Sequence, residues 1–450
     1  MRLTILGGGG FRVPLVYRAL LADRRPGRVT DVVLHDVAAD RLAAIRRVLA
    51  EQAAGIPDPP RVTATTDLDE AVRGTDFVFS AMRVGGMAGR AADERIALDE
   101  GVLGQETVGA GGVSYALRTL PVARHVARRV AALAPGAWVV NFTNPAGTVT
   151  EAMAAHLGDR VIGICDSPVG LGRRVARALR LDPAAVRFDY AGLNHLGWLR
   201  GVHASGTDHL PRLLADREAL ASFEEGRLFG AGWLRALGAV PNEYLHHYYY
   251  TREAVAAART GGRTRGALLL EQQRRFYAAA AGPGSALAAW EDARLERERT
   301  YGAEGRAATG AGPRDAADLD GGGYEQVALA LMRAIAHDEP ATLVLNVRNR
   351  GTLGILDAEA VVEVPCAVDA TGARPLPADP LPEHAAGLVC AVKAVERAAI
   401  EAAVTGSRSA ALKAIALHPL VDSVTVARRL LDAYTRHHPQ LSYLSPRRAP

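Results

Sequence analysis

Residues that could do chemistry together follow short apolar runs along this chain. Cys165 and its neighbour Asp166 come directly after the run VIGI, and His195 follows a second short run thirty residues after the cysteine. A thiolate and an imidazole suit a divalent transition metal, but two protein ligands are too few for a closed structural site. The remaining positions would belong to substrate and water, as a catalytic Lewis acid requires. A buried small residue at a strand end is the alternative interpretation of Cys165.

Three further segments carry candidate polar residues. Glu106 stands among glycines in GVLGQETVGAGG, and Asn144 follows an apolar run in NFTNPAG, where a plain Asn-Pro turn is the alternative. Tyr244 opens the aromatic cluster of PNEYLHHYYY, half of which could equally be a packed aromatic face. A tyrosine used as a base needs help from its surroundings, because its ordinary pKa of roughly 10 keeps it protonated at neutral pH.

Four consecutive glycines, Gly7, Gly8, Gly9 and Gly10, lie between an apolar run and a helical pattern. Glycines there let backbone N–H groups approach a pyrophosphate, which the helix N-terminus also attracts, although Arg replaces the third glycine of the usual G-x-G-x-x-G motif. Asp36 ends the next strand, where a carboxylate would bind the ribose hydroxyls of NAD and disfavour the extra phosphate of NADP. A glycine turn alone can be structural, but the whole combination predicts an NAD site.

Short apolar strands alternate with amphipathic helices over the first 170 residues. The expected strands are Leu3–Leu6, Val32–His35, Phe77–Ser80, Ala137–Phe142 and Val161–Ile164. The expected helices are Pro14–Ala22, Ala39–Ala54, Leu117–Leu133 and Val149–His156. This alternation predicts an α/β fold in which a doubly wound parallel sheet forms a Rossmann-like domain over residues 1–170. Ligands bind beyond the carboxyl ends of the strands in such sheets, which is where these motifs fall.

The pattern changes after residue 170. Longer helices alternate with strand-like pieces such as Val361–Val368, which predicts an α+β, largely helical second domain over residues 171–450. The Gly-, Ala- and Asp-rich stretch Gly302–Gly323 is typical of a mobile loop.

Composition excludes several classes of protein. The net charge of +4 is the small difference between 53 basic and 49 acidic residues, and the arginines are scattered, so nucleic-acid binding is not indicated. No apolar segment approaches the ~20 residues of a membrane span, and the N-terminus lacks the features of a signal peptide. Three widely spaced cysteines do not make a disulfide framework. We therefore expect a cytoplasmic protein with reduced thiols that binds neither nucleic acid nor membrane.

Taken together, these motifs resemble one family. The segments occur in the family's order: ILGGGGF, RVGG with GRAADE, LGQETVGAGG, NFTNPAG, GICDSPVG, GLNHLGW, PNEYLHHYYY, NVRNRG and VVEVPC. The chain resembles glycoside hydrolase family 4, the glycosidases that require NAD⁺ and manganese. The resemblance covers nearly the whole chain, and it rests on the order and spacing of the motifs more than on any single one.

The resemblance implies a route of hydrolysis that differs from that of two-carboxylate glycosidases. Bound NAD⁺ would take a hydride from C3 of the sugar, and the metal would polarise the resulting ketone and acidify the proton on C2. A base would take that proton, and the C1 leaving group would be eliminated. Water would then add, and NADH would return the hydride to C3.

Residue roles also follow from the matching motifs. Tyr244 corresponds to the C2 base, Glu106 to the residue that raises its basicity, and Asp166 to the leaving-group acid of some members. Positions matching the metal ligands are Cys165 and His195. Substrate-binding positions match Arg90, Asn144 and Arg265, and an arginine can grip a sugar phosphate with two hydrogen bonds.

The chain departs from the family pattern at several positions. Gly10 stands where the family often has serine, and DLDGGGYEQVA replaces a stretch that carries one more basic residue, so the phosphate site is less well supported than the redox site. Asp166 is usual among α-glucoside members, whereas β-glucoside members often carry asparagine. The PNEYL segment and the overall layout favour a 6-phospho-β-glucosidase acting on a phosphorylated cellobiose-type disaccharide. Family analogy further implies a C-terminal fold like that of lactate dehydrogenase and a homodimer or homotetramer.

Other functions remain open at this point. A 6-phospho-α-glucosidase or an α-galactosidase-like member of the same family is one alternative. An NAD-dependent 2-hydroxy-acid dehydrogenase would need no metal and would accumulate NADH. A non-catalytic NAD or sugar-phosphate sensor would have no reason to keep Cys165, His195, Tyr244 and Glu106 together.

Overall fold

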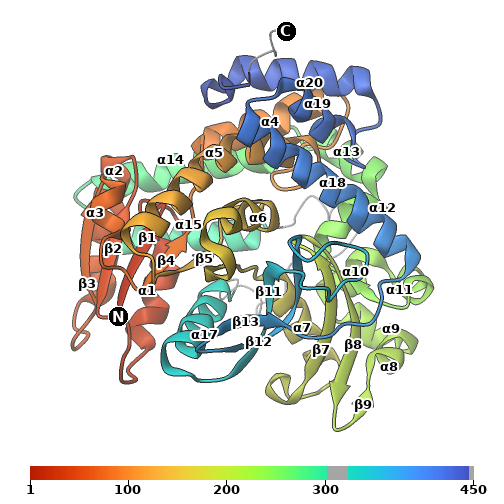
Figure 1. Ribbon diagram of the computed structural model, residues 1–450, viewed down its shortest axis with the longest axis horizontal. Helices are drawn as coiled ribbons and strands as arrows, with labels where there is room; N and C mark the ends of the chain where they lie inside the picture. Colours follow the sequence, from red (N-terminus) through yellow and green to blue (C-terminus); the bar gives the residue numbers. More distant parts are fainter. Residues whose placement is uncertain (302–322, 445–450) are drawn as a thin grey trace.

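The computed structural model describes residues 1–301 and 323–444 and contains one mixed sheet that runs through the molecule (Figure 1). One half of the sheet is parallel, with strand order β3-β2-β1-β4-β5-β6. Its strands are β1 (Arg2–Leu6), β2 (Asp31–His35), β3 (Arg61–Thr65), β4 (Phe77–Ser80), β5 (Trp138–Asn141) and β6 (Val161–Gly163). The central strands are buried on both faces, which explains their near-continuous apolar runs.

The other half of the sheet is antiparallel and continues from β6 in the order β11-β12-β7-β8-β10. Its strands are β7 (Arg187–Leu193), β8 (Leu196–Ala204), β10 (Val240–Pro241), β11 (Ala341–Arg348) and β12 (Val361–Asp369). Two short strands pair at its margin, β9 (Thr207–Asp208) with β8 and β13 (Gly372–Pro375) with β12. A late segment of the chain therefore joins the two halves into one sheet.

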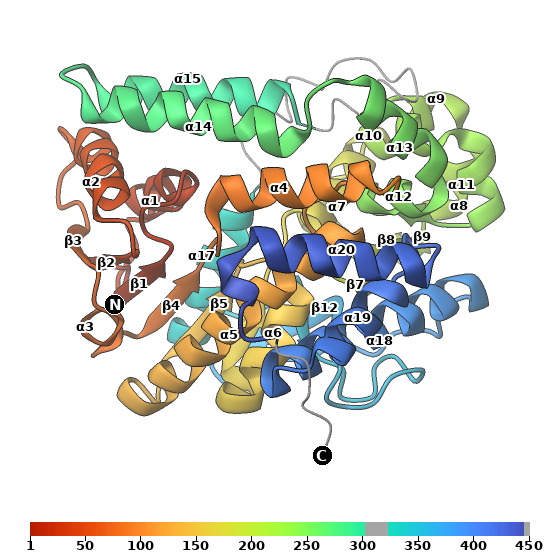
Figure 2. The same ribbon diagram turned by 90° about the horizontal axis from the view of Figure 1, so that it is seen from above.

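Helices cover the parallel half on both faces. They are α1 (Val13–Ala22), α2 (Ala39–Ala53), α3 (Leu68–Val72), α5 (Gly109–Leu133) and α6 (Ala146–Leu157). Helix α4 (Gly86–Asp99) packs on α5, and α7 (Ser167–Ala178) contacts β8. A pair of long helices, α14 (Arg265–Ala281) and α15 (Ala286–Arg299), lies side by side and reaches from the α2 edge toward the antiparallel half (Figure 2). The pair is fastened at that edge, where Arg47 donates to the Gly282 carbonyl at 2.7 Å.

The remaining helices belong to the later part of the chain. A first group lies beside the antiparallel half: α8 (Leu210–Ala215), α9 (Arg217–Ala221), α10 (Glu224–Phe229), α11 (Ala231–Leu237), α12 (His246–Tyr249) and α13 (Thr251–Thr260). A second group is α17 (Tyr324–His337), α18 (Glu383–Thr405), α19 (Arg408–Ala416) and α20 (Val424–His437). Helices α18, α19 and α20 share a buried apolar cluster with α5, so the C-terminal helices pack on the N-terminal half. No described helix combines the length and apolar character needed to cross a membrane.

The predicted α/β class is confirmed, and the expected strands and helices of the first 170 residues agree with the structure to within a few residues except at α5, which begins eight residues earlier. Strand β3 was not predicted, because RVTAT is a half-exposed edge strand without a clear apolar run. Helix α4 was not predicted either, since its first turn contains two glycines. The division at residue 170 remains a prediction, as does the loop expected over 302–323, which lies outside the described residues apart from Gly323.

Candidate active site

A cavity of about 370 Å³ opens at the carboxyl ends of the parallel strands and extends beneath α14 and α15. All predicted catalytic, metal-binding and substrate-binding residues line it: Glu106, Asp166, Tyr244, Cys165, His195, Arg90, Asn144 and Arg265. Of the predicted nucleotide-binding residues, Gly7 and Gly10 line the cavity. Gly8, Gly9 and Asp36 belong to the same loop region without forming part of the lining. The structure thus brings together residues that are spread over most of the chain.

The glycine turn forms one end of the cavity. Gly7 has a φ of +78°, and a Cβ atom there would lie 2.5 Å from the Ala81 carbonyl oxygen, so only glycine fits. Asp36 accepts hydrogen bonds from the N–H groups of Gly9 and Ala38, each at 3.1 Å. A carboxylate has about four lone-pair sites, which leaves room for ribose hydroxyls. The cradle and the acid therefore fit a dinucleotide such as NAD⁺.

Helix α14 closes this end from above. The Tyr277 hydroxyl donates to the Gly9 carbonyl at 2.6 Å, and the Arg41 guanidinium lies 5.0 Å from the centre of the Tyr277 ring. Arg41 and Tyr277 both line the cavity. The nucleotide end of the cavity is thus bounded by the glycine turn below and by α14 above.

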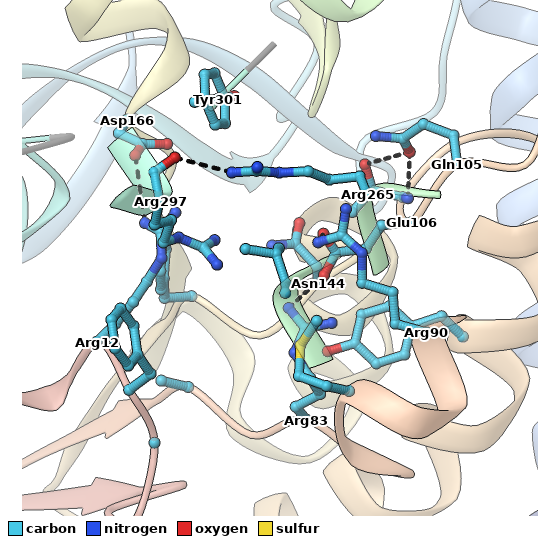
Figure 3. Close-up of a pocket in the computed structure, with 18 of the residues that line it drawn as sticks. Arg12, Arg83, Arg90, Gln105, Glu106, Asn144, Asp166, Arg265, Arg297 and Tyr301 are labelled. Carbon is cyan, nitrogen blue, oxygen red and sulfur yellow. Dashed lines mark hydrogen bonds and ion pairs between the residues drawn. The ribbon is translucent and has the colours of Figure 1, made fainter. Parts of the chain in front are cut away.

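Arg12 lies at the start of α1, where the usual motif has its third glycine. Its guanidinium pairs with Asp166 at 3.6 Å (Figure 3). The same group lies 5.5 Å from the centre of the Phe142 ring and 5.1 Å from that of the Tyr324 ring. Sequence reasoning treated Arg12 as a missing glycine and overlooked its side chain. Its signal was a positive charge placed directly after the glycine turn.

His195 reaches the cavity from the two-residue turn between β7 and β8. It has a φ of +61°, a conformation that is uncommon for a residue with a side chain and that surrounding contacts must hold. The neighbouring Asn194 donates to the buried Glu363 carboxylate at 3.1 Å, and Asn346 donates to the same oxygen at 2.9 Å. These bonds from β11 and β12 fix the turn that presents the imidazole.

Cys165 and His195 have the chemistry of metal ligands. Burial, together with Glu363 and Asp166, raises the pKa of Cys165 well above its usual range, so the thiol is neutral without a cation beside it. Burial lowers the pKa of His195 to about 4, which leaves its imidazole uncharged and able to bind a metal. Among the described residues no group of three or more His, Cys, Asp or Glu forms a metal cage. The pair therefore fits a two-ligand metal site that substrate completes.

Tyr244 lies flat against His195, with ring centres 3.7 Å apart and an interplanar angle of 14°. Burial raises the pKa of Tyr244 well above its usual value, and the nearby charges of Glu243 and Glu106 raise it further. A phenolate formed there would be strongly basic. Glu106 thus acts on Tyr244 in the direction that the family resemblance implies.

Glu106 itself is held by two arginines. Its carboxylate is ion-paired with Arg83 and Arg90, and these charges outweigh the cost of burial and hold the pKa of Glu106 well below its usual range. Arg90 also donates its Nε to Glu94 at 2.7 Å, and the other oxygen of Glu94 accepts the Gly266 N–H at 2.6 Å. Arg83 was not singled out from the sequence, although it opens the quoted RVGG motif.

Two further arginines come from α14 and α15 (Figure 3). Arg265 donates to Thr300 at 2.6 Å and to the Arg297 carbonyl at 2.9 Å. The Arg297 side chain is half-buried, and in the described parts of the chain its buried Nε atom has no hydrogen-bond partner. Burial and the positive charges of Arg12, Arg265 and Arg90 lower the pKa of Arg297. Sequence reasoning missed Arg297, because it lies in an ordinary charged helical pattern, LERER.

Two sequence profiles match most of this chain. The profile described as "Family 4 glycosyl hydrolase" matches residues 2–181, and the profile described as "Family 4 glycosyl hydrolase C-terminal domain" matches residues 190–421. The chain is a family 4 glycosyl hydrolase. The expected family is therefore confirmed, and with it the prediction of a glycosidase rather than a dehydrogenase or a sensor.

Relatives of this glycosyl hydrolase carry names for both anomers. A Bacillus subtilis protein named "Probable 6-phospho-beta-glucosidase" is 31% identical over 97% of this chain and 96% of its own length. A "6-phospho-alpha-glucosidase" of Leptotrichia buccalis is 30% identical over 96% of each chain. A crystal structure of the 6-phospho-beta glucosidase from Thermotoga maritima, with manganese, NAD⁺ and glucose-6-phosphate, is 26% identical and has a TM-score of 0.81 over 98% of this chain and 99% of the other.

Proposed function

We propose that this family 4 glycosyl hydrolase cleaves the O-glycosidic bond of a 6-phospho-β-glucoside, such as a phosphorylated cellobiose-type disaccharide, with NAD⁺ and a divalent metal such as manganese as cofactors. The observation that carries the phosphate in this proposal is the crowding of guanidinium groups around one cavity. Arg12, Arg90 and Arg265 all act electrostatically on Arg297, and Arg297 lacks a partner at Nε among the described residues. A phosphate monoester would supply the missing negative charge.

Asn144 supports a sugar ligand in the same place. Its Oδ1 is buried without a hydrogen-bond partner in the part of the chain that the structure describes, and it lies on the cavity wall among the arginines (Figure 3). A buried carbonyl oxygen of this kind is costly unless a ligand donates to it. A sugar hydroxyl is a suitable donor.

The β-anomer is favoured by one sequence motif and by the names of two relatives. The PNEYL segment favours it, and both the Bacillus subtilis relative and the Thermotoga maritima structure are β-glucosidases by name. The second candidate is a 6-phospho-α-glucosidase, which Asp166 and the Leptotrichia buccalis relative favour. The cavity residues discussed above would serve either candidate function.

The residues of this chain take the following parts in the proposed reaction. When bound, NAD⁺ supplies a hydride acceptor for C3 and the metal supplies a Lewis acid for the resulting ketone. Tyr244 takes the C2 proton, and Glu106 keeps its phenolate basic while holding Arg83 and Arg90 in place. Cys165 and His195 hold the metal, and the arginines and Asn144 orient the phosphorylated sugar.

The setting of the enzyme is also part of the proposal. We place it in the cytoplasm, because its three cysteines are free and are spaced too widely in the sequence for a disulfide framework. We further expect a homodimer or homotetramer. Sedimentation of the purified protein would give the oligomeric state.

The test pairs four nitrophenyl glucosides, α and β, each with and without a 6-phosphate. We expect turnover of the phosphorylated β-glucoside only, with dependence on NAD⁺ and Mn²⁺. Turnover of the phosphorylated α-glucoside alone would replace the β-anomer by the α-anomer. Equal turnover of substrates with and without phosphate, or brisk turnover after NAD⁺ and metal have been removed, would contradict the proposal.

A further inference from the structure

Three of the carboxyl groups that line the cavity, those of Glu106, Asp166 and Glu243, differ in their environments. Glu106 is paired with two arginines, and Asp166 is paired with Arg12 at 3.6 Å. Glu243 lines the same cavity, but neither of its oxygens is paired with an arginine or lysine in the described chain. The carboxyl group next in sequence to the proposed base is thus the one of the three without an ion-pair partner.

The two oxygens of Glu243 are not equivalent. Oε1 accepts a hydrogen bond from the Ser167 hydroxyl at 2.7 Å and a long one from the Tyr301 hydroxyl at 3.4 Å. Oε2 is buried and has no hydrogen-bond partner among the described residues. The neighbouring Asn242 accepts the Tyr244 N–H at 3.0 Å and so fixes the short 3₁₀ turn, Glu243–Leu245, that carries both acid and base. One oxygen is anchored, and the other is available to a ligand.

We propose that the Glu243 carboxyl group donates the proton that the departing aglycone oxygen takes up when its bond to C1 breaks. C1 is adjacent to C2, just as Glu243 is adjacent to the base Tyr244. Tyr301 supports this placement, because Tyr244, Glu243 and Asp166 all act electrostatically on its hydroxyl, and the acid and the base therefore belong to one part of the cavity. Glu243 would therefore act in place of Asp166, whose carboxylate faces Arg12.

The step balances in both halves of the reaction. The electron pair of the bond from C1 moves onto the aglycone oxygen, which takes the Glu243 proton and leaves as an alcohol. The carboxylate that remains accepts a proton from the water molecule that adds to C1. Glu243 is then an acid again, and Tyr244, which took the C2 proton before elimination, returns it to C2 as water adds to C1. The elimination itself rests on the function proposed above.

The surroundings of Glu243 bring its pKa into the neutral range. Burial, reinforced by Glu225 and Glu224 on α10, raises the pKa of Glu243 to about 7, while Arg174 on α7 and the Ser167 hydrogen bond oppose the rise. The donor is the protonated form. The contribution of Glu243 should therefore be present below pH 7 and be lost as the pH rises through 7.

The experiment compares two aglycones in wild type, Glu243→Gln and Asp166→Asn. Nitrophenol leaves as a stable anion and needs no proton, whereas methanol needs one. Loss of a general acid costs about 10²- to 10⁴-fold. We expect Glu243→Gln to lower kcat/KM for the methyl 6-phosphoglucoside by about 10²-fold or more and for the nitrophenyl one by less than about tenfold. In wild type, kcat/KM for the methyl glycoside alone should fall as the pH rises through 7.

Solvent deuterium exchange at C2 of glucose 6-phosphate separates this role from folding. Exchange needs the base and both cofactors but no cleavage at C1, so Glu243→Gln should retain it, whereas Tyr244→Phe should lose it. Equal losses on both aglycones, a dependence on the aglycone in Asp166→Asn instead, or lost exchange in Glu243→Gln would each overturn the proposal. Failure of the wild-type enzyme to hydrolyse either glycoside or to exchange C2 would instead overturn the proposed function.

Discussion

The two ends of the cavity differ in how their polar groups are satisfied. At the nucleotide end, Asp36 accepts hydrogen bonds from the backbone N–H groups of Gly9 and Ala38, and the Tyr277 hydroxyl donates to the Gly9 carbonyl. At the sugar end, polar atoms of Arg297, Asn144 and Glu243 are buried without a partner among the described residues. A buried polar atom without a hydrogen bond costs roughly 1–3 kcal/mol, so the protein retains such a cluster at a net cost to its stability.

The difference indicates what each end requires of its ligand. The nucleotide end is held in shape by hydrogen bonds within the chain, and a ligand would add to an arrangement already made. The sugar end leaves one buried donor, the Nε of Arg297, and two buried acceptors, the Oδ1 of Asn144 and the Oε2 of Glu243, without partners among the described residues, and a phosphorylated sugar would supply hydrogen bonds to them. Changes at the sugar end should therefore act mainly on ligand affinity and turnover, and they should do so more strongly than changes at the nucleotide end.

The largest effect is expected from the metal pair at the sugar end. Cys165→Ser removes the thiolate that would bind the metal. Loss of a residue that only supports a metal ligand lowers metal affinity roughly 10- to 100-fold, so loss of the ligand itself should lower Mn²⁺ affinity by more. Titration of Mn²⁺, followed by the electron spin resonance of the free ion, measures this directly, and turnover should fall with it. Cys366 is equally buried but lies outside the cavity, so Cys366→Ser should bind Mn²⁺ as wild type does. Unchanged Mn²⁺ affinity in Cys165→Ser would remove this residue from the metal site.

The next effect concerns the phosphate. Hydrogen bonds to charged groups are worth about 1.5–3 kcal/mol, so Arg297→Met should weaken glucose 6-phosphate binding by roughly 10- to 100-fold. Calorimetry with glucose and with glucose 6-phosphate separates the phosphate from the sugar, and glucose binding should be unaffected. Arg200→Met is the control, because Arg200 is similarly buried, pairs with Asp189 at 2.8 Å and lies outside the cavity. Equal losses for both ligands would mean that Arg297 does not bind the phosphate.

The same contrast explains what the sequence could predict. The glycines and Asp36 of the nucleotide end belong to a local pattern of strand, glycines, helix and strand, so they could be identified from the sequence. Tyr277 could not, because α14 brings it from 268 residues further along the chain. The metal pair and the base could be identified because the family resemblance supplied them. The roles of Arg297 and Glu243 could not be identified from the sequence. Each is distinguished by one buried atom without a hydrogen-bond partner among the described residues, and that depends on how α14, α15 and α7 pack around the cavity.

The fold divides in a similar way. The parallel half follows from alternation of strands and helices along the chain, and its predicted strands agree with the structure. The joining of β11 to β6 does not follow from any local pattern, since those strands are separated by about 180 residues and meet at a single register pair, Asn346 with Gly163. Only glycine fits at this crossing, because a Cβ at residue 163 would lie 2.7 Å from the Cβ atom of Asn346 on β11 and 2.5 Å from the Thr150 hydroxyl on α6.

A smaller effect should follow from loosening the arginines without removing them. Glu94 is buried and joins Arg90 to the N-terminus of α14, next to Arg265, so it is a positioning residue. Glu94→Gln loses one of these two contacts, and KM for the phosphorylated substrate should rise by about tenfold while kcat changes by less than about threefold. The matched control is Glu151→Gln, because Glu151 also accepts from a cation and a backbone N–H but lies on α6. A fall in kcat with unchanged KM would contradict the positioning role.

The smallest effect is expected at the nucleotide end, and it tests whether that end is complete without its ligand. Tyr277→Phe removes one neutral hydrogen bond, to the Gly9 carbonyl, which is worth about 0.5–1.5 kcal/mol. Because Asp36 still holds the glycine turn, NAD⁺ affinity measured by calorimetry should fall by only about threefold, and glucose 6-phosphate affinity should not change. Tyr443→Phe is the control, since its hydroxyl donates to the Leu117 carbonyl at 2.8 Å away from the cavity. A hundredfold loss of NAD⁺ affinity in Tyr277→Phe would mean that this end also depends on a single contact, and the contrast between the two ends would not hold.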